Sequence, residues 1–282
     1  MNQLKTTVLL ALLTGLLMLL GNMVAGHTGV LVMFIISMGI NFYSYWFSDT
    51  VVLKMYRARE VSPSSSLYKL VEDLVKNADM PMPKVCIIPS HVPNAFATGR
   101  NPEHSAVAVT EGLLEILDDE EVAGVLSHEL SHILHRDTLI STVAASIAGV
   151  ISMIANMAQW AAIFGRDDED NNPIALMATA IIAPLAAAVI QMAISRSREF
   201  MADESGGRIS GQPLALANAL RKIENYANHR VLGGATTATA HMFIINPFSG
   251  VRSGLQTLFS THPSTAARIE KLEALDREMH RR

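Results

Sequence analysis

Residues 118–136 read DDEEVAGVLSHELSHILHR, and this stretch predicts the helix on which the rest of the fold depends. Acidic residues gather at its start, where negative charge is favourable at the positive end of the helix dipole. Asp118, followed three residues later by Glu121, matches a capping box, in which each side chain accepts a backbone amide. The helix is therefore expected to start here and to continue from Val122 to Arg136.

Inside this helix, His128-Glu129-Leu130-Ser131-His132 forms the arrangement H-E-x-x-H. Residues four apart lie on one face of a helix, so the imidazoles of His128 and His132 can bind the same ion. Glu129 is then placed as the general base beside the water that a zinc ion activates. The alternative is a surface helix that carries these residue types at this spacing by chance.

A catalytic zinc needs a third protein ligand and an open position for water. Four downstream residues could supply that ligand: Glu199, Asp203, Glu204 and His262. Glu199 and Asp203 are four residues apart in a segment that is predicted to be helical. If Glu199 binds the metal, Asp203 can hold the free N–H of a ligand imidazole, as carboxylates do behind zinc-bound histidines.

Charge is scarce in this chain and unevenly distributed. Of its 282 residues 17% are charged and 50% hydrophobic, and the mean hydropathy is +0.28. Three runs of 43, 28 and 25 residues carry no charge, at 6–48, 138–165 and 171–195. All 48 charged side chains lie in the other 186 residues, which therefore have the composition of an ordinary soluble domain. The net charge of −4 argues against a nucleic-acid partner.

The run 6–48 is long enough for two membrane-spanning helices, since one crossing needs about 20 residues. Turn-forming residues gather in its middle, at 21–22 and 26–29, which predicts a hairpin with spans near 5–25 and 29–48. Aromatic residues within 43–47 close the second span as an interfacial belt does. The alternative is a cleaved signal peptide.

The two later runs predict a second pair of apolar helices within 138–195, and the alternative is a buried helix pair in a soluble domain. Basic residues flank the runs on one side: Lys5, Lys54, Arg57, Arg59, Arg136, Arg196 and Arg198. On the other side Arg166 lies among four acidic residues. The positive-inside rule therefore predicts that both termini and the polar segments are cytoplasmic.

The first polar segment predicts a small sheet with a helix beside it. Apolar residues at helical spacing predict a helix over Ser66–Asn77. Lys84–Ile88 and Ser105–Thr110 are predicted strands, and residues 93–99 between them fit either a strand edge or a loop. Cys86 is the single cysteine, so the chain has no intrachain disulfide.

The chain is accordingly divided into four parts. An N-terminal transmembrane hairpin occupies 1–50, and the first part of a catalytic domain, with the H-E-x-x-H helix, occupies 51–137. A second hydrophobic helix pair, predicted to be transmembrane, occupies 138–195. The second part of the catalytic domain, with the third zinc ligand, occupies 196–282.

Four motifs carry a family resemblance that, with the N-terminal hairpin, covers nearly the whole chain. They are Pro93-Asn94-Ala95-Phe96-Ala97, His128-Glu129-x-x-His132, Ser197-Arg198-Glu199-Phe200-x-Ala202-Asp203, and Thr261-His262-Pro263 with Arg268. In these motifs the chain resembles the HtpX-type family of membrane-bound zinc metalloproteases, which is of the gluzincin type and related to the CaaX prenyl protease family. The resemblance implies a mainly α fold with a small β-sheet, built from integral-membrane helices and a zincin-like cytosolic metalloprotease domain.

The resemblance also implies how the site is built. One zinc ion per subunit is expected on His128, His132 and Glu199, with Glu129 as the catalytic residue. Asp203 is implied as the carboxylate behind a ligand.

His262 is raised as an oxyanion donor, although by sequence alone other histidines are equally available: His91, His104, His229 and His241. The segment Asn94, Ala95, Phe96 and Ala97 resembles an edge strand on which substrate is laid as an added β-strand.

The implied function is the hydrolysis of misfolded or damaged membrane proteins in the stress response, at the bacterial inner membrane, with a multi-pass anchor and a cytoplasmic active site. The expected partners are unfolded or membrane protein substrates and the lipid bilayer. The sequence does not indicate an oligomeric state. Two alternatives are a prenyl-peptide protease of the same family and a membrane protein whose zinc is structural.

Overall fold

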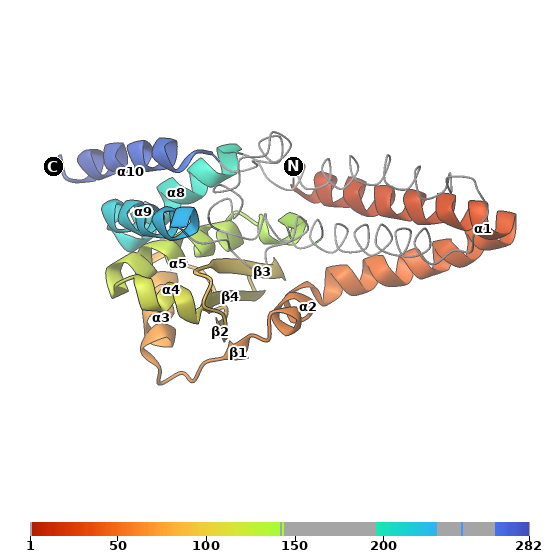
Figure 1. The fold of residues 1–282 in the computed structure, drawn as a ribbon, viewed down its shortest axis with the longest axis horizontal. Helices are drawn as coiled ribbons and strands as arrows, with labels where there is room; N and C mark the ends of the chain where they lie inside the picture. The colour runs from red at the N-terminus through yellow and green to blue at the C-terminus, as the bar shows by residue number, and fades with distance from the viewer. Residues whose placement is uncertain (1, 142, 144–195, 230–243, 245–262, 282) are drawn as a thin grey trace.

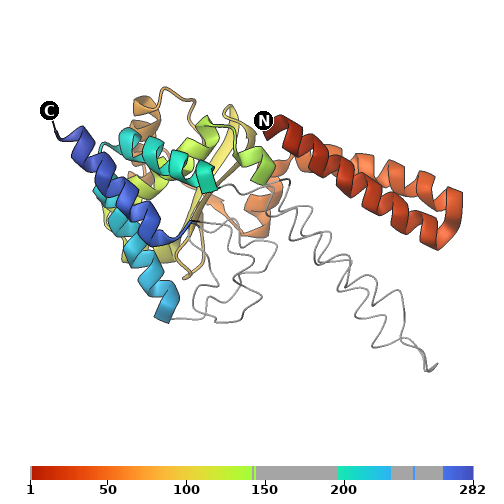
Figure 2. The same cartoon turned by 90° about the horizontal axis from the view of Figure 1, so that it is seen from above.

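The computed structural model describes residues 2–141, 143, 196–229, 244 and 263–281. These residues are mainly helical with one small mixed sheet, which confirms the predicted fold class at that level. Figures 1 and 2 show a long helical hairpin that projects from a body in which helices surround the sheet. Most of the predicted apolar pair 138–195 lies outside the described residues, and so does His262.

The hairpin, α1 (Asn2–Trp46), consists of two antiparallel helices that meet at a sharp bend (Figure 1). The bend is at Gly26, whose φ of +56° favours glycine, and it lies in the stretch where the sequence predicts a turn. Across the hairpin, the side-chain amide of Asn41 donates to the Leu10 carbonyl (3.3 Å) and to the Thr14 hydroxyl (2.9 Å). The predicted helical hairpin is therefore present.

Within the described residues, the segment Ala25–Tyr43 is long and apolar enough to cross a membrane, and Thr6–Leu19 is a shorter apolar helix. Large apolar side chains of the hairpin are exposed, including Leu31 (66%) and Ile35 (70%). Exposed apolar surface of this kind marks a membrane or protein contact. That both helices cross a bilayer stays a prediction.

The sheet has the strand order β1-β2-β4-β3, so β3 lies at an edge. Its strands are β1 (Arg59–Glu60), β2 (Lys84–Ile88), β3 (Ala95–Asn101) and β4 (His104–Thr110). β2 and β4 are parallel, whereas β1 and β3 run antiparallel to their neighbours. β2 has the predicted bounds, and β4 starts one residue before the prediction. The open question at 93–99 is answered by a strand that begins at Ala95.

The helices of the body surround α5, which carries the H-E-x-x-H motif. They are α2 (Ser48–Met55), α3 (Ser66–Asn77), α4 (Glu111–Ile116), α5 (Asp119–Leu134), α8 (Arg196–Ser210), α9 (Pro213–His229) and α10 (Thr265–Met279). α3 has the predicted bounds. α5 starts at the predicted capping box, in which Asp118 and Glu121 each accept the other's backbone amide, at 2.9 and 3.0 Å. α5 ends two residues before the prediction, because Arg136 adopts a left-handed φ of +57°.

The two faces of the sheet are covered by different parts of the chain. Val85 and Val107 pack into the main core, which includes side chains of α3, α5 and α9. Cys86 and Phe96 face the other way and pack with Val52 of α2. Because α2 follows the hairpin directly, the hairpin is joined to the body through this second face.

Candidate metal centre

The candidate metal centre lies where α5 and α8 pack against each other. Gly206 of α8 lies against the α5 backbone, so that an added Cβ would be 2.8 Å from the His128 amide nitrogen and 2.9 Å from its Cα. Any larger residue would push the two helices apart. Glycine at this position therefore lets α8 bring Glu199 and Asp203 up to α5.

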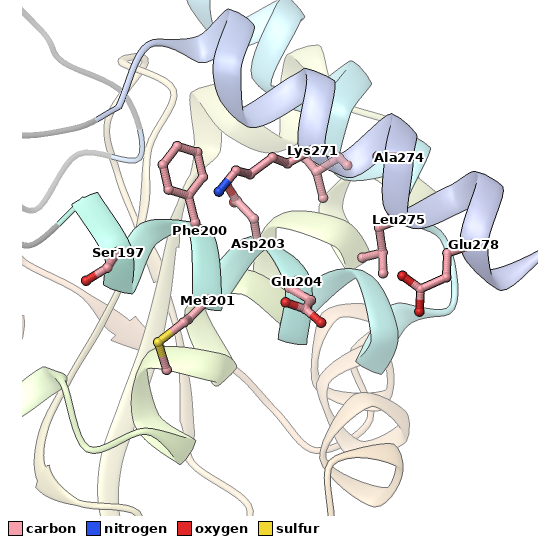
Figure 3. Close-up of a pocket in the computed structure, with 10 residues that line it drawn as sticks. Ser197, Phe200, Met201, Asp203, Glu204, Lys271, Ala274, Leu275 and Glu278 are labelled. Carbon is pink, nitrogen blue, oxygen red and sulfur yellow. The ribbon is translucent and has the colours of Figure 1, made fainter.

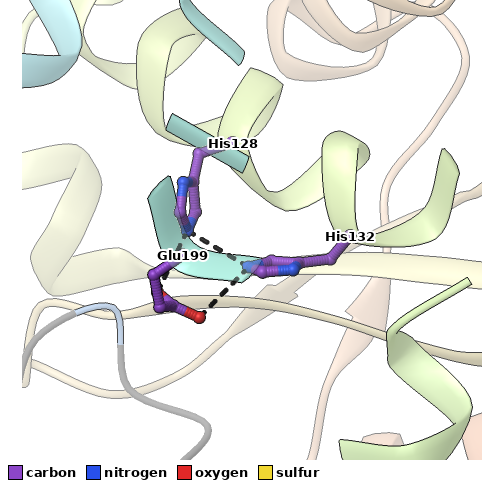
Figure 4. A group of neighbouring side chains, drawn as sticks. All are labelled: His128, His132 and Glu199. Carbon is purple, nitrogen blue, oxygen red and sulfur yellow. Dashed lines mark hydrogen bonds and ion pairs between the residues drawn. The ribbon is translucent and has the colours of Figure 1, made fainter. Parts of the chain in front are cut away.

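The side chains of His128, His132 and Glu199 converge on one point (Figure 4). The Nε2 atoms of the two histidines are 3.3 Å apart, and Glu199 Oε2 and Oε1 lie 3.8 and 3.7 Å from them. One donor atom from each residue lies within 4.8 Å of the others, so the three can hold a metal ion. Of the candidates for the third position, Glu204 instead pairs with Arg208 at the surface.

The chemistry of these donors fits zinc. Two imidazoles and one carboxylate are the donor set of a catalytic zinc site and leave a fourth position for water. In the described part of the chain, no further His, Cys, Asp or Glu joins the group. A structural zinc, which is normally closed by four protein ligands, fits this set less well.

Behind the first histidine lies a buried carboxylate–guanidinium pair. His128 Nδ1 is 3.0 Å from Asp203 Oδ1, as the spacing from Glu199 suggested. Arg268 donates to both oxygens of Asp203, at 2.6 and 2.8 Å, and is 1% exposed. Burial alone would raise the pKa of the Asp203 carboxyl, but the charge of Arg268 outweighs it and holds this pKa well below its usual range. Asp203 is therefore ionised and can accept the Nδ1–H of His128.

The same arginine connects the centre with the edge strand. Arg268 Nη1 donates to the Ile244 carbonyl (2.8 Å), and the Ile244 amide donates to Asn94 Oδ1 (3.2 Å). Asn94, just before β3, is 3% exposed. These bonds join three segments that are distant in the sequence into one buried polar network.

Behind the second histidine lies a pair that sequence reasoning missed. His132 Nδ1 is 3.4 Å from Asp137 Oδ2, and Asp137 Oδ1 is 3.5 Å from Arg198 Nη1. Asp137 comes five residues after His132, which is not a helical spacing, and it returns to His132 only because Arg136 turns the chain. The only signal in the sequence was an acidic residue directly after the predicted helix.

Glu129 faces the edge strand. Its Oε2 accepts the backbone N–H of Ala97 at 3.0 Å, and 6% of the residue is exposed. Burial raises the pKa of the Glu129 carboxyl. A carboxyl whose pKa is raised in this way is a better proton acceptor than an exposed one and so is suited to take and return a proton.

The segment predicted to bind substrate is buried, apart from half-buried Ala97. The backbone N–H and C=O of Asn94 both bond to Thr110, the last residue of β4, so they point away from the outer edge of β3. The amide of Ala97 points to Glu129, and alternate residues of a strand face alternate sides. The main chain of Ala95 and Ala97 is therefore the part of this segment that faces the centre.

A separate groove of 470 Å³ lies between α8 and α10 (Figure 3). It shares Asp203 with the centre but none of the three converging ligands. Lys271 lies over the ring of Phe200 at its side, 3.5 Å from the ring centroid. The groove is thus distinct from the space in front of His128 and His132.

Known proteins resemble this chain over most of its length. The family model "Peptidase family M48" matches residues 62–276. The "Protease HtpX homolog" of Sulfurihydrogenibium sp. is 53% identical over 290 residues, which cover 99% of this chain and 97% of that protein. The protein of the same name from Thermococcus kodakarensis is 54% identical, over 98% and 97% of the two chains.

Among solved structures, the crystal structure of S. mikatae Ste24p matches with a TM-score of 0.50 at 16% sequence identity. The match covers 85% of this chain, but this chain spans only 57% of the Ste24p chain. The likeness concerns the fold.

Proposed function

Because this chain belongs to peptidase family M48 and is a membrane-associated metalloprotease, we propose that it is a zinc endopeptidase acting on unfolded or damaged membrane proteins. The observation that carries the proposal is the convergence of His128, His132 and Glu199 beside the buried carboxyl of Glu129. When bound, zinc supplies a water of lowered pKa and polarises the carbonyl to be attacked.

The chain's own residues perform the proton transfers. Glu129 accepts the proton of the attacking water, and the raised pKa of its carboxyl lets it keep that proton until the peptide nitrogen leaves. It then delivers the proton to the amine. Asp203 and Arg268 hold His128 in the tautomer whose Nε2 lone pair faces the metal. A donor for the oxyanion is also required, and His262 remains our candidate.

Substrate is proposed to bind as an extended strand along β3. This strand is the edge of the sheet, and the amide of Ala97 lies beside the general base. An added strand would pair with the main chain of Ala95 and the carbonyl of Ala97, whose amide is bonded to Glu129, so recognition would depend on backbone rather than on side chains. Such recognition suits unfolded segments of varied sequence.

The anchor supports a location at the inner membrane of a bacterium, with several spans and with both termini and the centre in the cytoplasm. The support is the exposed apolar surface of the hairpin and the basic residues that flank the uncharged runs. We propose the four-part division at 50, 137 and 195 on the same grounds.

The test compares wild type with Glu129→Gln, both purified in detergent and loaded with zinc, on an unfolded membrane protein. We expect both to retain one zinc per chain and the variant to cleave about 10²–10⁴-fold more slowly. Cleavage at the wild-type rate by the variant would exclude Glu129 as the base. A prenylated peptide serves as a second substrate, and preference for it would favour the prenyl-peptide alternative.

A further inference from the structure

The metal centre contains two carboxylate–arginine pairs, one behind each histidine. Asp203 with Arg268 lies behind His128, and Asp137 with Arg198 lies behind His132. The second pair is also shielded from solvent, since the side chains of Asp137 and Arg198 are 5% and 12% exposed. The sequence predicted the place of Asp203 behind a ligand but not its pairing with Arg268, and it predicted no role in the centre for Asp137 or Arg198.

The backbone brings Asp137 to His132 and holds it there. Arg136 has a φ of +57°, and the Asp137 amide donates to the His132 carbonyl at 2.8 Å, which closes the end of α5. The next residue, Thr138, donates its hydroxyl to the Gly99 carbonyl of β3 at 3.0 Å. Asp137 is thus fixed from both sides, with its carboxylate at the far nitrogen of His132.

This arrangement meets a requirement of a zinc-binding histidine. The ring must be neutral and must present its Nε2 lone pair, and a carboxylate that accepts the Nδ1–H fixes that tautomer and makes the ring a better donor. Arg198 Nη1 lies 3.5 Å from the opposite oxygen of Asp137, so the carboxylate is held between the imidazole and the guanidinium. We propose that Asp137 is a positioning residue for His132 and that Arg198 acts through Asp137. The proposal rests on the zinc site proposed above.

Asp137 and Arg198 lie at the two ends of the chain segment that contains the second and third uncharged runs. Asp137 directly precedes the uncharged run that begins at Thr138, and Arg198 follows the run that ends at Ser195. The two ends of the chain segment that contains both runs therefore meet behind one zinc ligand. The geometry of His132 depends on how these ends approach each other.

The experiment measures zinc affinity by competition with a chelator, on full-length protein in detergent. Asp137→Asn keeps the size of the side chain and removes its charge, and we expect it to weaken zinc binding about 10- to 100-fold. Arg198→Met should weaken zinc binding by a smaller factor, and Arg198→Lys should restore most of it. The visible absorption of Co²⁺ in the site should change in Asp137→Asn, which a purely structural role would not cause.

The control is Arg208→Met, because Arg208 lies on the same helix as Arg198 but forms its ion pairs at the surface, with two carboxylates. It should bind zinc as wild type does. In the double variant Asp137→Asn/Arg198→Met, the loss should equal that of Asp137→Asn alone.

Equal zinc affinity and an unchanged cobalt spectrum in Asp137→Asn would overturn the inference while leaving the zinc site intact. A wild type that binds no zinc would instead refute the proposed function. Melting of the metal-free protein shows whether Asp137→Asn folds. If it does not fold, Arg198→Met and Arg198→Lys are compared with each other. Equal zinc affinities in these two variants would reject the role of Arg198 and, with it, the proposal.

Discussion

At the scale of single residues, Cys86 offers a direct test of the packing between the sheet and α2. It is 3% exposed, and burial raises the pKa of its thiol from the usual 9.0 to about 11. At pH 8 about one molecule in a thousand then carries the reactive thiolate, compared with about one in ten for an ordinary cysteine. In the unfolded chain the thiol loses its proton near pH 9, whereas in the folded protein it keeps the proton up to about pH 11. The folded state therefore becomes less stable as the pH rises from 9 to about 11.

We therefore expect iodoacetamide to modify the folded protein at pH 8 at least about 100-fold more slowly than the protein unfolded in denaturant. Because Cys86 is the single cysteine, mass spectrometry of the whole chain follows the reaction without ambiguity. Equal rates in the folded and unfolded protein would show that α2 does not cover this face of the sheet.

Residue identities in the centre were predictable only where spacing carries the information. His128, Glu129 and His132 follow from a helical repeat. Spacing alone left Glu199 as one of four candidates; the family resemblance singled it out, and the fold brings it to the histidines. Asp137 was missed because its approach depends on the left-handed backbone of Arg136, a conformation that sequence rarely reveals for a residue other than glycine.

At the scale of elements, the contact between α5 and α8 decides whether the ligands meet. Gly206→Ala would place a Cβ 2.8 Å from the His128 amide nitrogen. If either helix moved to relieve this contact, the distance between Glu199 on α8 and the histidines on α5 would change. We expect a loss of about 1–3 kcal/mol in stability together with weaker zinc binding. Melting of the metal-free protein and chelator competition measure the two effects.

The matched control is Gly39→Ala in α1, where an added Cβ meets no atom within 4 Å. It should leave zinc binding unchanged. Wild-type zinc affinity in Gly206→Ala would mean that the close approach of α8 is not needed to assemble the centre.

Elements with strong local signals were predicted well. α3 and β2 have the expected bounds, since an amphipathic repeat and a short apolar run between prolines leave few alternatives. The start of α5 was predicted equally well, because the capping box is a local sequence signal. The short strand β1 was not foreseen, because two exposed residues become a strand only by pairing with β2.

At the scale of the whole molecule, the anchor and the centre are linked through the edge strand. Arg100 of β3 donates to the Trp46 carbonyl at the end of the hairpin (2.9 Å), and its guanidinium lies 4.7 Å from the centre of the Trp46 ring. Ala97, three residues earlier on β3, bonds to the general base. In the proposed arrangement, with substrate along β3 and the hairpin in the membrane, this contact would set the height of the bound substrate above the membrane surface.

This link predicts that Arg100→Ala discriminates between substrates. A substrate segment that emerges from the bilayer must reach β3 at a fixed height, whereas a soluble unfolded peptide approaches from any direction. Losing an exposed cation–π contact of about 0.5–1 kcal/mol should lower kcat/KM for the membrane-tethered form roughly 2- to 5-fold and leave the soluble form nearly unchanged. The measurement uses one cleavable sequence in both forms, with enzyme in lipid vesicles. Arg59→Ala, an exposed arginine on the opposite edge strand β1, is the control and should affect neither form. An equal loss for both substrates would place the effect of Arg100 in the stability of β3 rather than in its position relative to the membrane.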